Sequence, residues 1–228
     1  MSYLNESSAA PATIAARLPP RDLLRQVLAE YVAETPAGLA LIRAAWNLPS
    51  VWPAQVERVY RFGPPVELKA ASGWPFFWIY AAEAAFTAVW EAQFCMHPVT
   101  HPGRFMLAPG AENGLIATLS FDDALRWFDL SGDAASKLGI YDPLRSPDYA
   151  WCQWLGVELD QLLLERGGGV HGFIYPSRRH PGQRAYAISS RSRDSLAVML
   201  RQRVVTFGDS AEYAELMADP CRIDIGAL

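Results

Sequence analysis

The stretch FFWIYAAEAAFTAVWEAQF, residues 76–94, decides how the fold is read. Residues 76–81 are almost all aromatic or aliphatic, which predicts a short buried strand. Residues 82–94 then repeat apolar side chains at intervals of three and four positions, which is the pattern of one helix face. Thr87 and Glu91 lie four positions apart on another face. The stretch therefore predicts a strand that runs directly into a helix.

A second region with clear helix and strand patterns lies in the C-terminal half of the chain. Residues 149–165 predict an amphipathic helix, and a run of three glycines ends it. Strands are predicted over 170–175 and 185–188, on either side of a turn near Pro181. Strands scattered among helices favour an α+β domain, with a mixed or antiparallel sheet core and surrounding helices. The other predicted elements are strands at 55–62, 115–119 and 204–207 and a short helix at 122–128.

The beginning of the chain has a different pattern. Apolar residues recur at helical intervals over 23–31 and again over 39–46, and a proline at position 49 follows the second run. Residues 1–52 are therefore predicted to form a helical N-terminal extension to a main domain that covers 53–228. Each helix must bury its apolar stripe against the main domain or against another chain, so a homo-oligomer is one alternative.

The chain of 228 residues is 51% hydrophobic and carries a formal net charge of −4, which is typical of a globular protein. This balance argues against direct nucleic-acid binding, because such proteins use a basic field to neutralise phosphates. Arginines nevertheless cluster locally, and they form either a solvated face or a surface that steers an anionic substrate: Arg178, Arg179, Arg184, Arg191 and Arg193.

Three widely spaced cysteines, without a CxxC pair, indicate neither a disulfide framework nor a thiolate metal site. His97 and His101 lie four positions apart, but the prolines that follow each of them exclude the helix that would align them on a metal ion. We therefore expect no metal. The sequence shows no secretory signal and no run of about 20 apolar residues. We expect a cytoplasmic protein without membrane contact, or one delivered into a target cell without a signal peptide.

Several short motifs, each weak alone, follow one another along the chain. In order they are VYRF (59–62), IYA (79–81), TAVWE (87–91), FDLS (128–131), LGI (138–140) and GFIYPSR (172–178). Together they resemble the RES family, which is named for an arginine, a glutamate and a serine of this kind. The resemblance covers roughly residues 55–210.

The resemblance implies a toxin of a bacterial toxin–antitoxin pair, with a fold similar to ADP-ribosyltransferases. Members of the family degrade NAD⁺, some of them by phosphorolysis with inorganic phosphate as co-substrate. The chain is therefore expected to be an NAD⁺ glycohydrolase or NAD⁺ phosphorylase that cleaves the nicotinamide–ribose bond and depletes cellular NAD⁺. An unregulated enzyme of this kind would kill its host, so we expect a cognate antitoxin or immunity protein that covers the active site.

The residue types in the motifs suit this chemistry. Nicotinamide leaves through an oxocarbenium-like ribose, and the negative charge of Glu91 would stabilise that cation. Arg61 offers a planar fork of donors for the pyrophosphate, and Tyr80 can stack on the nicotinamide ring. Ser177 can orient a ribose or phosphate oxygen. The resemblance thus assigns Glu91, Arg61 and Tyr80 to catalysis, and Arg61, Lys69, Tyr80 and Ser177 to NAD⁺ binding.

The assignment of Lys69 rests on a departure from the family pattern. The family has a Gly-Gly-Arg-aromatic-Asn stretch between its first arginine and its tyrosine, whereas residues 65–74 read PVELKAASGW. Lys69 lies near the position of the missing second arginine. A lysine contacts phosphate as a point charge and not as a bidentate fork, so substrate affinity and phosphorolysis depend on this replacement.

Three alternatives stay open at this point. ADP-ribosyl transfer to a protein would use the same bond cleavage with a different acceptor. A non-catalytic interaction module would result if loss of the second arginine had left the site vestigial. A secreted antibacterial effector, paired with an immunity protein, is the alternative to a toxin–antitoxin toxin.

Overall fold

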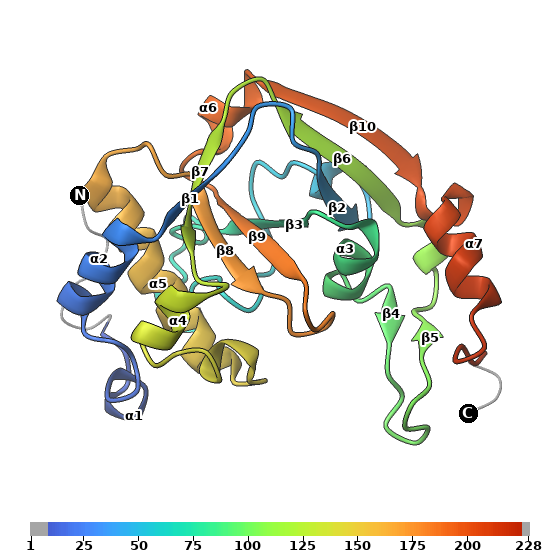
Figure 1. Ribbon diagram of the computed structural model, residues 1–228, viewed down its shortest axis with the longest axis horizontal. Coiled ribbons are helices and arrows are strands. Elements are labelled where there is room, and N and C mark those ends of the chain that lie inside the picture. Colours follow the sequence, from blue (N-terminus) through green and yellow to red (C-terminus); the bar gives the residue numbers. More distant parts are fainter. Residues whose placement is uncertain (1–8, 225–228) are drawn as a thin grey trace.

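The computed structural model describes residues 9–224, which form one large curled sheet, a two-stranded ribbon and surrounding helices (Figure 1). The strands of the large sheet are β1 (Val32–Thr35), β2 (Leu41–Ala45), β3 (Trp78–Ala82), β6 (Leu115–Phe121), β7 (Leu125–Asp129), β8 (Gly172–Pro176), β9 (Arg184–Ser189) and β10 (Leu200–Thr206). The ribbon consists of β4 (Cys95–Met96) and β5 (Met106–Leu107). The helices are α1 (Ala12–Ala15), α2 (Arg21–Glu30), α3 (Ala85–Glu91), α4 (Asp133–Lys137), α5 (Tyr149–Arg166), α6 (Arg193–Ala197) and α7 (Ala211–Ala218).

The strands of the large sheet are ordered β1-β7-β8-β9-β3-β2-β6-β10. All neighbours pair antiparallel except β7 and β8, which are parallel and are connected through α4 and α5. The predicted α+β class with a mixed sheet core is thereby confirmed. The expected likeness to ADP-ribosyltransferases stays a prediction. Among the helices within residues 9–224, none is long and apolar enough to cross a membrane.

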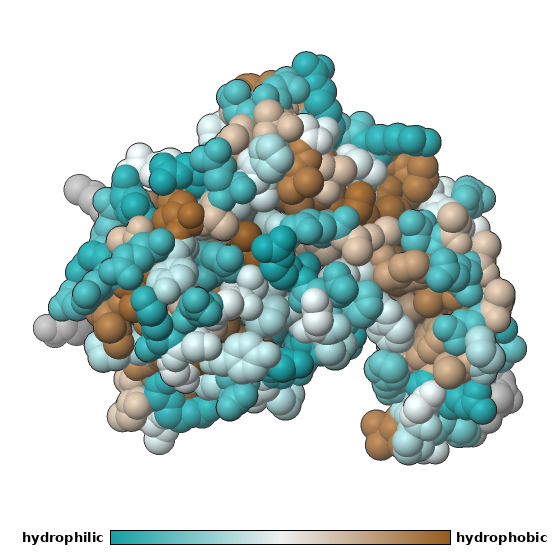
Figure 2. Space-filling view, viewed as in Figure 1, coloured by the Kyte–Doolittle hydropathy of each residue, from teal (hydrophilic) through white to brown (hydrophobic). Residues whose placement is uncertain are grey.

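The helices divide between two parts of the molecule. Figure 1 shows α2, α4 and α5 near β1, β7 and β8, whereas α3, α7 and the β4–β5 ribbon lie on the side of β2, β6 and β10. The molecular surface is deeply notched between these two parts (Figure 2). The helix α5 belongs to the largest core cluster and buries residues around most of its circumference. Its N-terminal end is capped by Asp148, which accepts a hydrogen bond from the backbone of Trp151.

A close contact between α5 and the segment before residue 63 fixes one wall of the site. Gly156 faces the backbone of Phe62, where a Cβ would lie 1.9 Å from the carbonyl oxygen of Phe62. The indole of Trp78 donates a hydrogen bond of 2.7 Å to the same carbonyl oxygen. The ring of Phe62 packs edge-on against Phe173, with centroids 5.1 Å apart. These contacts hold an irregular segment in place without a strand ladder.

The strand–helix order predicted for residues 76–94 is confirmed as β3 and α3, although α3 already ends at Glu91. After the helix, Gln93 adopts a φ of 61°, the left-handed conformation that a glycine usually takes at a helix C-terminus. The backbone N–H of Phe94 donates to the carbonyl of Val89 at 3.1 Å, which closes this turn. The predicted helices at 23–31 and 149–165, and the predicted strands at 115–119, 170–175, 185–188 and 204–207, are also present with somewhat different bounds.

The predicted helix over 39–46 is wrong, because these residues contain β2. This strand lies between β3 and β6, and its two faces enter different core clusters: Leu41 and Ala45 in one, Ala44 in the other. A strand covered on both faces lacks polar alternation and resembles a short apolar helix in sequence. The expected helical N-terminal extension over 1–52 is not confirmed, because β1 and β2 belong to the large sheet; residues 1–8 lie outside the described part.

Two other expected elements differ. The predicted helix at 122–128 is wrong, because β7 begins at Leu125 and alternates buried Leu125, exposed Arg126 and buried Trp127. Residues 55–62 alternate in sequence, but they form turns and irregular backbone instead of the predicted strand. This segment packs on α5 and not beside another strand, so alternation alone was misleading.

Candidate active site

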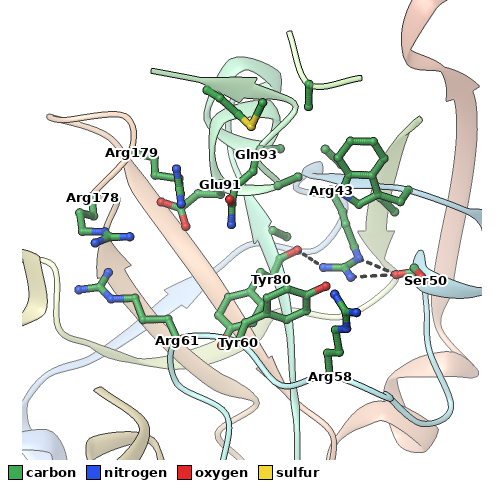
Figure 3. Close-up of a pocket in the computed structure, with 18 of the residues that line it drawn as sticks. Arg43, Ser50, Arg58, Tyr60, Arg61, Tyr80, Glu91, Gln93, Arg178 and Arg179 are labelled. Atoms are coloured by element: carbon green, nitrogen blue, oxygen red, sulfur yellow. Dashed lines mark hydrogen bonds between the residues drawn. The ribbon is translucent and has the colours of Figure 1, made fainter. Parts of the chain in front are cut away.

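A cavity of about 520 Å³ opens beside α3, β2 and β3 (Figure 3). Arg61, Tyr80 and Glu91, three of the residues predicted from the sequence, line it. Its walls come from β2 and the turn after it, the irregular segment 58–61, the end of α3, and the loop after β8. The lining residues with charged or hydrogen-bonding side chains are Arg43, Trp46, Asn47, Ser50, Arg58, Tyr60, Arg61, Tyr80, Glu91, Gln93, Tyr149, Tyr175, Arg178 and Arg179.

Glu91 is the last residue of α3, and two hydroxyl groups from β8 and the loop after it hold its carboxylate. Ser177 Oγ donates to Oε1 at 2.6 Å, and the hydroxyl of Tyr175 donates to Oε2 at 3.2 Å. Ser177 is buried, and its Oγ accepts a hydrogen bond of 3.0 Å from the backbone N–H of His180. Both carboxylate oxygens are therefore oriented before any ligand arrives.

The hydroxyl of Tyr175 keeps its proton for this purpose. Burial raises the pKa of Tyr175 well above its usual value, and the charge of Glu91 adds to that effect. A protonated phenol can donate but an ionised one cannot. The hydroxyl of Tyr175 therefore remains a hydrogen-bond donor to Glu91 throughout the physiological pH range.

Tyr80 lies on β3 with its ring on the cavity wall. Its hydroxyl accepts a hydrogen bond of 3.1 Å from the backbone N–H of Phe62, and burial raises its pKa. The ring contacts Tyr60 and Tyr175 edge-on, with centroids 6.2 and 6.3 Å away. The structure thus brings Tyr80 to the site, where it ties β3 to the segment that carries Arg61.

Arg61 is 7% exposed and uses its guanidinium incompletely. Its Nη2 donates to the carbonyls of Leu144 and Ser146. Its Nε and Nη1 are buried and donate to no oxygen or nitrogen of the described residues. The thiol of Cys152, a weak acceptor, is close enough for Arg61 to lower its pKa, although burial raises that pKa by more. Buried, unmatched donors of a guanidinium are suited to an anionic oxygen.

The cavity is strongly cationic although the chain is acidic. Five arginines line it, Glu91 being the sole carboxylate among the described lining residues. Arg43 is structurally engaged, because it donates to the carbonyls of Ser50 and Tyr80, and burial lowers its pKa to about 10. In Figure 3, Arg61 and Arg178 extend toward each other on one side of Glu91, whereas Arg58 lies on the other side. A ligand with several negative charges fits this lining.

Two of the sequence-predicted site residues, Ser177 and Lys69, do not line the cavity; Ser177 is buried against Glu91, which does line it, whereas Lys69 lies away from the site. It is exposed and absent from the lining, and its Nζ lies 5.0 Å above the ring of Trp74. The prediction that Lys69 takes the place of the missing arginine is therefore not supported. Arg58 and Arg178 lie at the cavity and supply cationic groups from other parts of the chain.

Sequence reasoning did not single out Arg43, Arg58 or Tyr60. The first lies on β2, which was interpreted as a helix, and the others lie in a segment interpreted as a regular strand. Arg178 and Arg179 were noted as a local basic cluster, and the motif at 172–178 was the signal that could have placed them here. Within residues 9–224, no group of three or more His, Cys, Asp or Glu side chains could hold a metal ion.

Comparison with known proteins identifies a related family. The family model described as RES domain matches residues 69–208, which is more than half of the chain. The matched range contains Tyr80, Glu91 and Ser177 and begins after Arg61. No curated protein and no solved structure gives a significant match.

Proposed function

The chain belongs to the RES-domain family, and from this premise we propose that it is an enzyme that cleaves NAD⁺ at the bond between nicotinamide and ribose. The observation that carries the proposal is the placement of Glu91. It presents an oriented carboxylate to a cavity that five arginines otherwise dominate. A dinucleotide with an anionic pyrophosphate and a cationic pyridinium ring, which leaves as neutral nicotinamide, matches both charge types.

Glu91 supplies the catalytic charge in this proposal. Loss of nicotinamide leaves positive charge on C1′ and on the ring oxygen of the ribose. A carboxylate that Ser177 and Tyr175 already orient stabilises this charge without further reorganisation. The effect exists mainly in the transition state, because the ribose of bound NAD⁺ is not yet cationic.

Arg61 supplies binding energy. A pyrophosphate oxygen near Nε and Nη1 would complete the hydrogen bonds that the described residues leave open. The rings of Tyr60 and Tyr80 on the cavity wall offer apolar faces for the nicotinamide. Arg178 and Arg179 offer donors for a second anion, which suits inorganic phosphate as the acceptor of the ADP-ribosyl group.

The proposed activity implies a partner and a site of action. A cytoplasmic enzyme that consumes NAD⁺ has to be inhibited in its own cell, and a cognate antitoxin or immunity protein that covers the cavity would achieve this. Strong expression of the chain alone should therefore stop growth and lower cellular NAD⁺, and co-expression of the inhibitor should restore both. Normal growth and normal NAD⁺ in cells that accumulate the folded protein would contradict the proposal.

The reaction itself is tested by its products. Purified protein is incubated with NAD⁺, with and without inorganic phosphate, and nicotinamide is measured by chromatography. We expect one nicotinamide for each NAD⁺ consumed, and mass spectrometry should detect ADP-ribose or its 1″-phosphate. A mass increase on a protein instead would assign the chain to ADP-ribosyl transfer. A folded protein that releases no nicotinamide would exclude NAD⁺ cleavage and favour a non-catalytic module.

A further inference from the structure

The turn after α3 contains an unusual residue for its conformation. Gln93 has a φ of 61°, and among residues 9–224 it is the one residue other than glycine with a positive φ. Its backbone N–H donates to the carbonyl of Trp90 at 3.1 Å, and Phe94 N–H donates to the carbonyl of Val89 at 3.1 Å. This pair of bonds defines a C-terminal cap in which glycine is the usual residue. A side chain other than glycine is kept here against its conformational preference.

The same turn places the side chain at the cavity. Gln93 lines the cavity two positions after Glu91, and in Figure 3 both side chains extend from the same wall toward the interior. No hydrogen bond joins the Gln93 carboxamide to another described residue. The left-handed turn therefore serves to direct an unengaged carboxamide to a point beside the catalytic carboxylate.

Among the described lining residues, Gln93 and Asn47 carry a carboxamide, whereas the hydroxyls of Tyr60 and Tyr149 combine donor and acceptor on a single atom. The arginines of the cavity donate and cannot accept. The carboxylate of Glu91 already accepts from two hydroxyls, and Asn47 Oδ1 already accepts from Ser50. Gln93 offers one carbonyl oxygen and one NH₂ group side by side. A primary carboxamide pairs with both at once, as does the edge of an adenine ring. The position of Gln93 beside Glu91, where the ribose C1′ is proposed to react, favours the nicotinamide carboxamide.

We propose that Gln93 recognises the carboxamide of the nicotinamide ring and so selects the leaving group. The inference deepens the proposed function and rests on it. If Glu91 stabilises charge at C1′ of the ribose, the base attached to C1′ lies near the same wall, within reach of a residue two positions further along. The Oε1 of Gln93 accepts from the NH₂ of nicotinamide, and its NH₂ donates to the nicotinamide oxygen. Gln93 is thus a specificity-determining residue and takes no part in bond cleavage.

The test compares NAD⁺ with 3-acetylpyridine adenine dinucleotide, which keeps the carbonyl oxygen but lacks the NH₂ group. The kcat/KM ratio of the two substrates is measured for the wild type, Gln93→Gly and Gln93→Asn. Because the intrinsic reactivity of each substrate is common to all three proteins, it cancels when the ratios are compared. We expect Gln93→Gly to lower the preference for NAD⁺ about tenfold, as loss of the one hydrogen bond from the nicotinamide NH₂ does. Gln93→Asn, which keeps a carboxamide and tolerates the left-handed turn, should retain part of the preference.

Gln93→Gly also separates recognition from folding. Glycine is the favoured residue at this cap, so the melting temperature of the variant should equal or exceed that of the wild type. If the wild type cleaves NAD⁺ and Gln93→Gly keeps the wild-type ratio, the inference about Gln93 is wrong while the proposed function stands. If the wild type releases no nicotinamide, the proposed function fails. Binding of free nicotinamide, measured by NMR, then tests the inference about Gln93 separately. Binding by the wild type that Gln93→Gly loses would support the inference, and equal or absent binding in both would overturn it.

Discussion

The two sides of the cavity hold their charged groups in opposite ways. On one side both oxygens of Glu91 accept hydrogen bonds, from the buried Ser177 and from Tyr175. On the other side Arg61 uses Nη2 and keeps Nε and Nη1 buried without an oxygen or nitrogen acceptor among the described residues. A charged group whose hydrogen bonds are all formed is positioned before the substrate binds. A group with unused hydrogen-bond donors forms its remaining bonds only with the substrate. The difference predicts that Glu91 controls turnover and Arg61 controls binding.

The largest effect is expected for Glu91→Gln. The amide keeps the shape of the side chain but removes the negative charge, so kcat should fall roughly 10²–10³-fold, the typical loss for one preorganised electrostatic group. KM for NAD⁺ should change little, because the charge acts on the transition state. The assay is nicotinamide release at saturating NAD⁺. Glu67→Gln, at an exposed carboxylate outside the cavity, is the matched control and should retain the wild-type rate.

Arg61→Lys should give the next largest effect, and it should be of the other kind. Lysine keeps the positive charge but loses the planar fork, so KM should rise roughly tenfold to a hundredfold while kcat changes less. Substitution by lysine is preferable to alanine, which would leave the carbonyls of Leu144 and Ser146 without their donor. The control is Arg126→Lys at an exposed position on β7. A fall in kcat with unchanged KM for Arg61→Lys would contradict the assignment of Arg61 to binding and Glu91 to turnover.

Ser177→Ala should have an intermediate effect on turnover. It removes the hydroxyl that donates to Glu91 at 2.6 Å and accepts from the His180 backbone at 3.0 Å. Because Ser177 positions the carboxylate and does not carry the charge, kcat should fall about tenfold, with a smaller change in KM. Steady-state kinetics and a thermal melt on the same preparation separate this role from a loss of folding. An unchanged kcat would show that the Tyr175 hydroxyl orients Glu91 sufficiently by itself.

The smallest effect is expected for Lys69→Ala. Lys69 is exposed to solvent, lies over the ring of Trp74 and does not line the cavity. KM and kcat should therefore stay within about twofold, and the loss of the cation–π contact should cost about 0.5–1 kcal/mol of stability at most. A rise in KM as large as that of Arg61→Lys would place Lys69 at the bound substrate and contradict its position in the structure.

The elements that sequence predicted well are those in which pattern and environment agree. The helix at 149–166 ends at Gly167, which takes a φ of 66°, as a glycine C-cap should. The strand at 172–176 leads directly into Ser177, and the helix that ends at Glu91 carries the carboxylate of the site. The carboxylate side of the cavity could therefore be predicted from residues and motifs.

The arginine side could not be predicted in the same way, because its positions depend on tertiary contacts. Arg43 lies on a strand that is buried on both faces, so its sequence pattern imitates a helix. Arg61 lies in irregular backbone that Gly156 and Trp78 hold through the carbonyl of Phe62. Nothing in the local sequence encodes these long-range contacts. The motif identified Arg61 without predicting why it is fixed.

The most direct test of the account is nicotinamide release measured over a wide range of NAD⁺ concentrations, in parallel for the wild type, Glu91→Gln and Arg61→Lys. We expect Glu91→Gln to saturate at the same NAD⁺ concentration as the wild type but at a plateau roughly 10²–10³-fold lower. Arg61→Lys should approach the wild-type plateau at much higher NAD⁺. If Glu91→Gln reaches the wild-type plateau, Glu91 does not stabilise the reacting ribose, and the central claim is wrong.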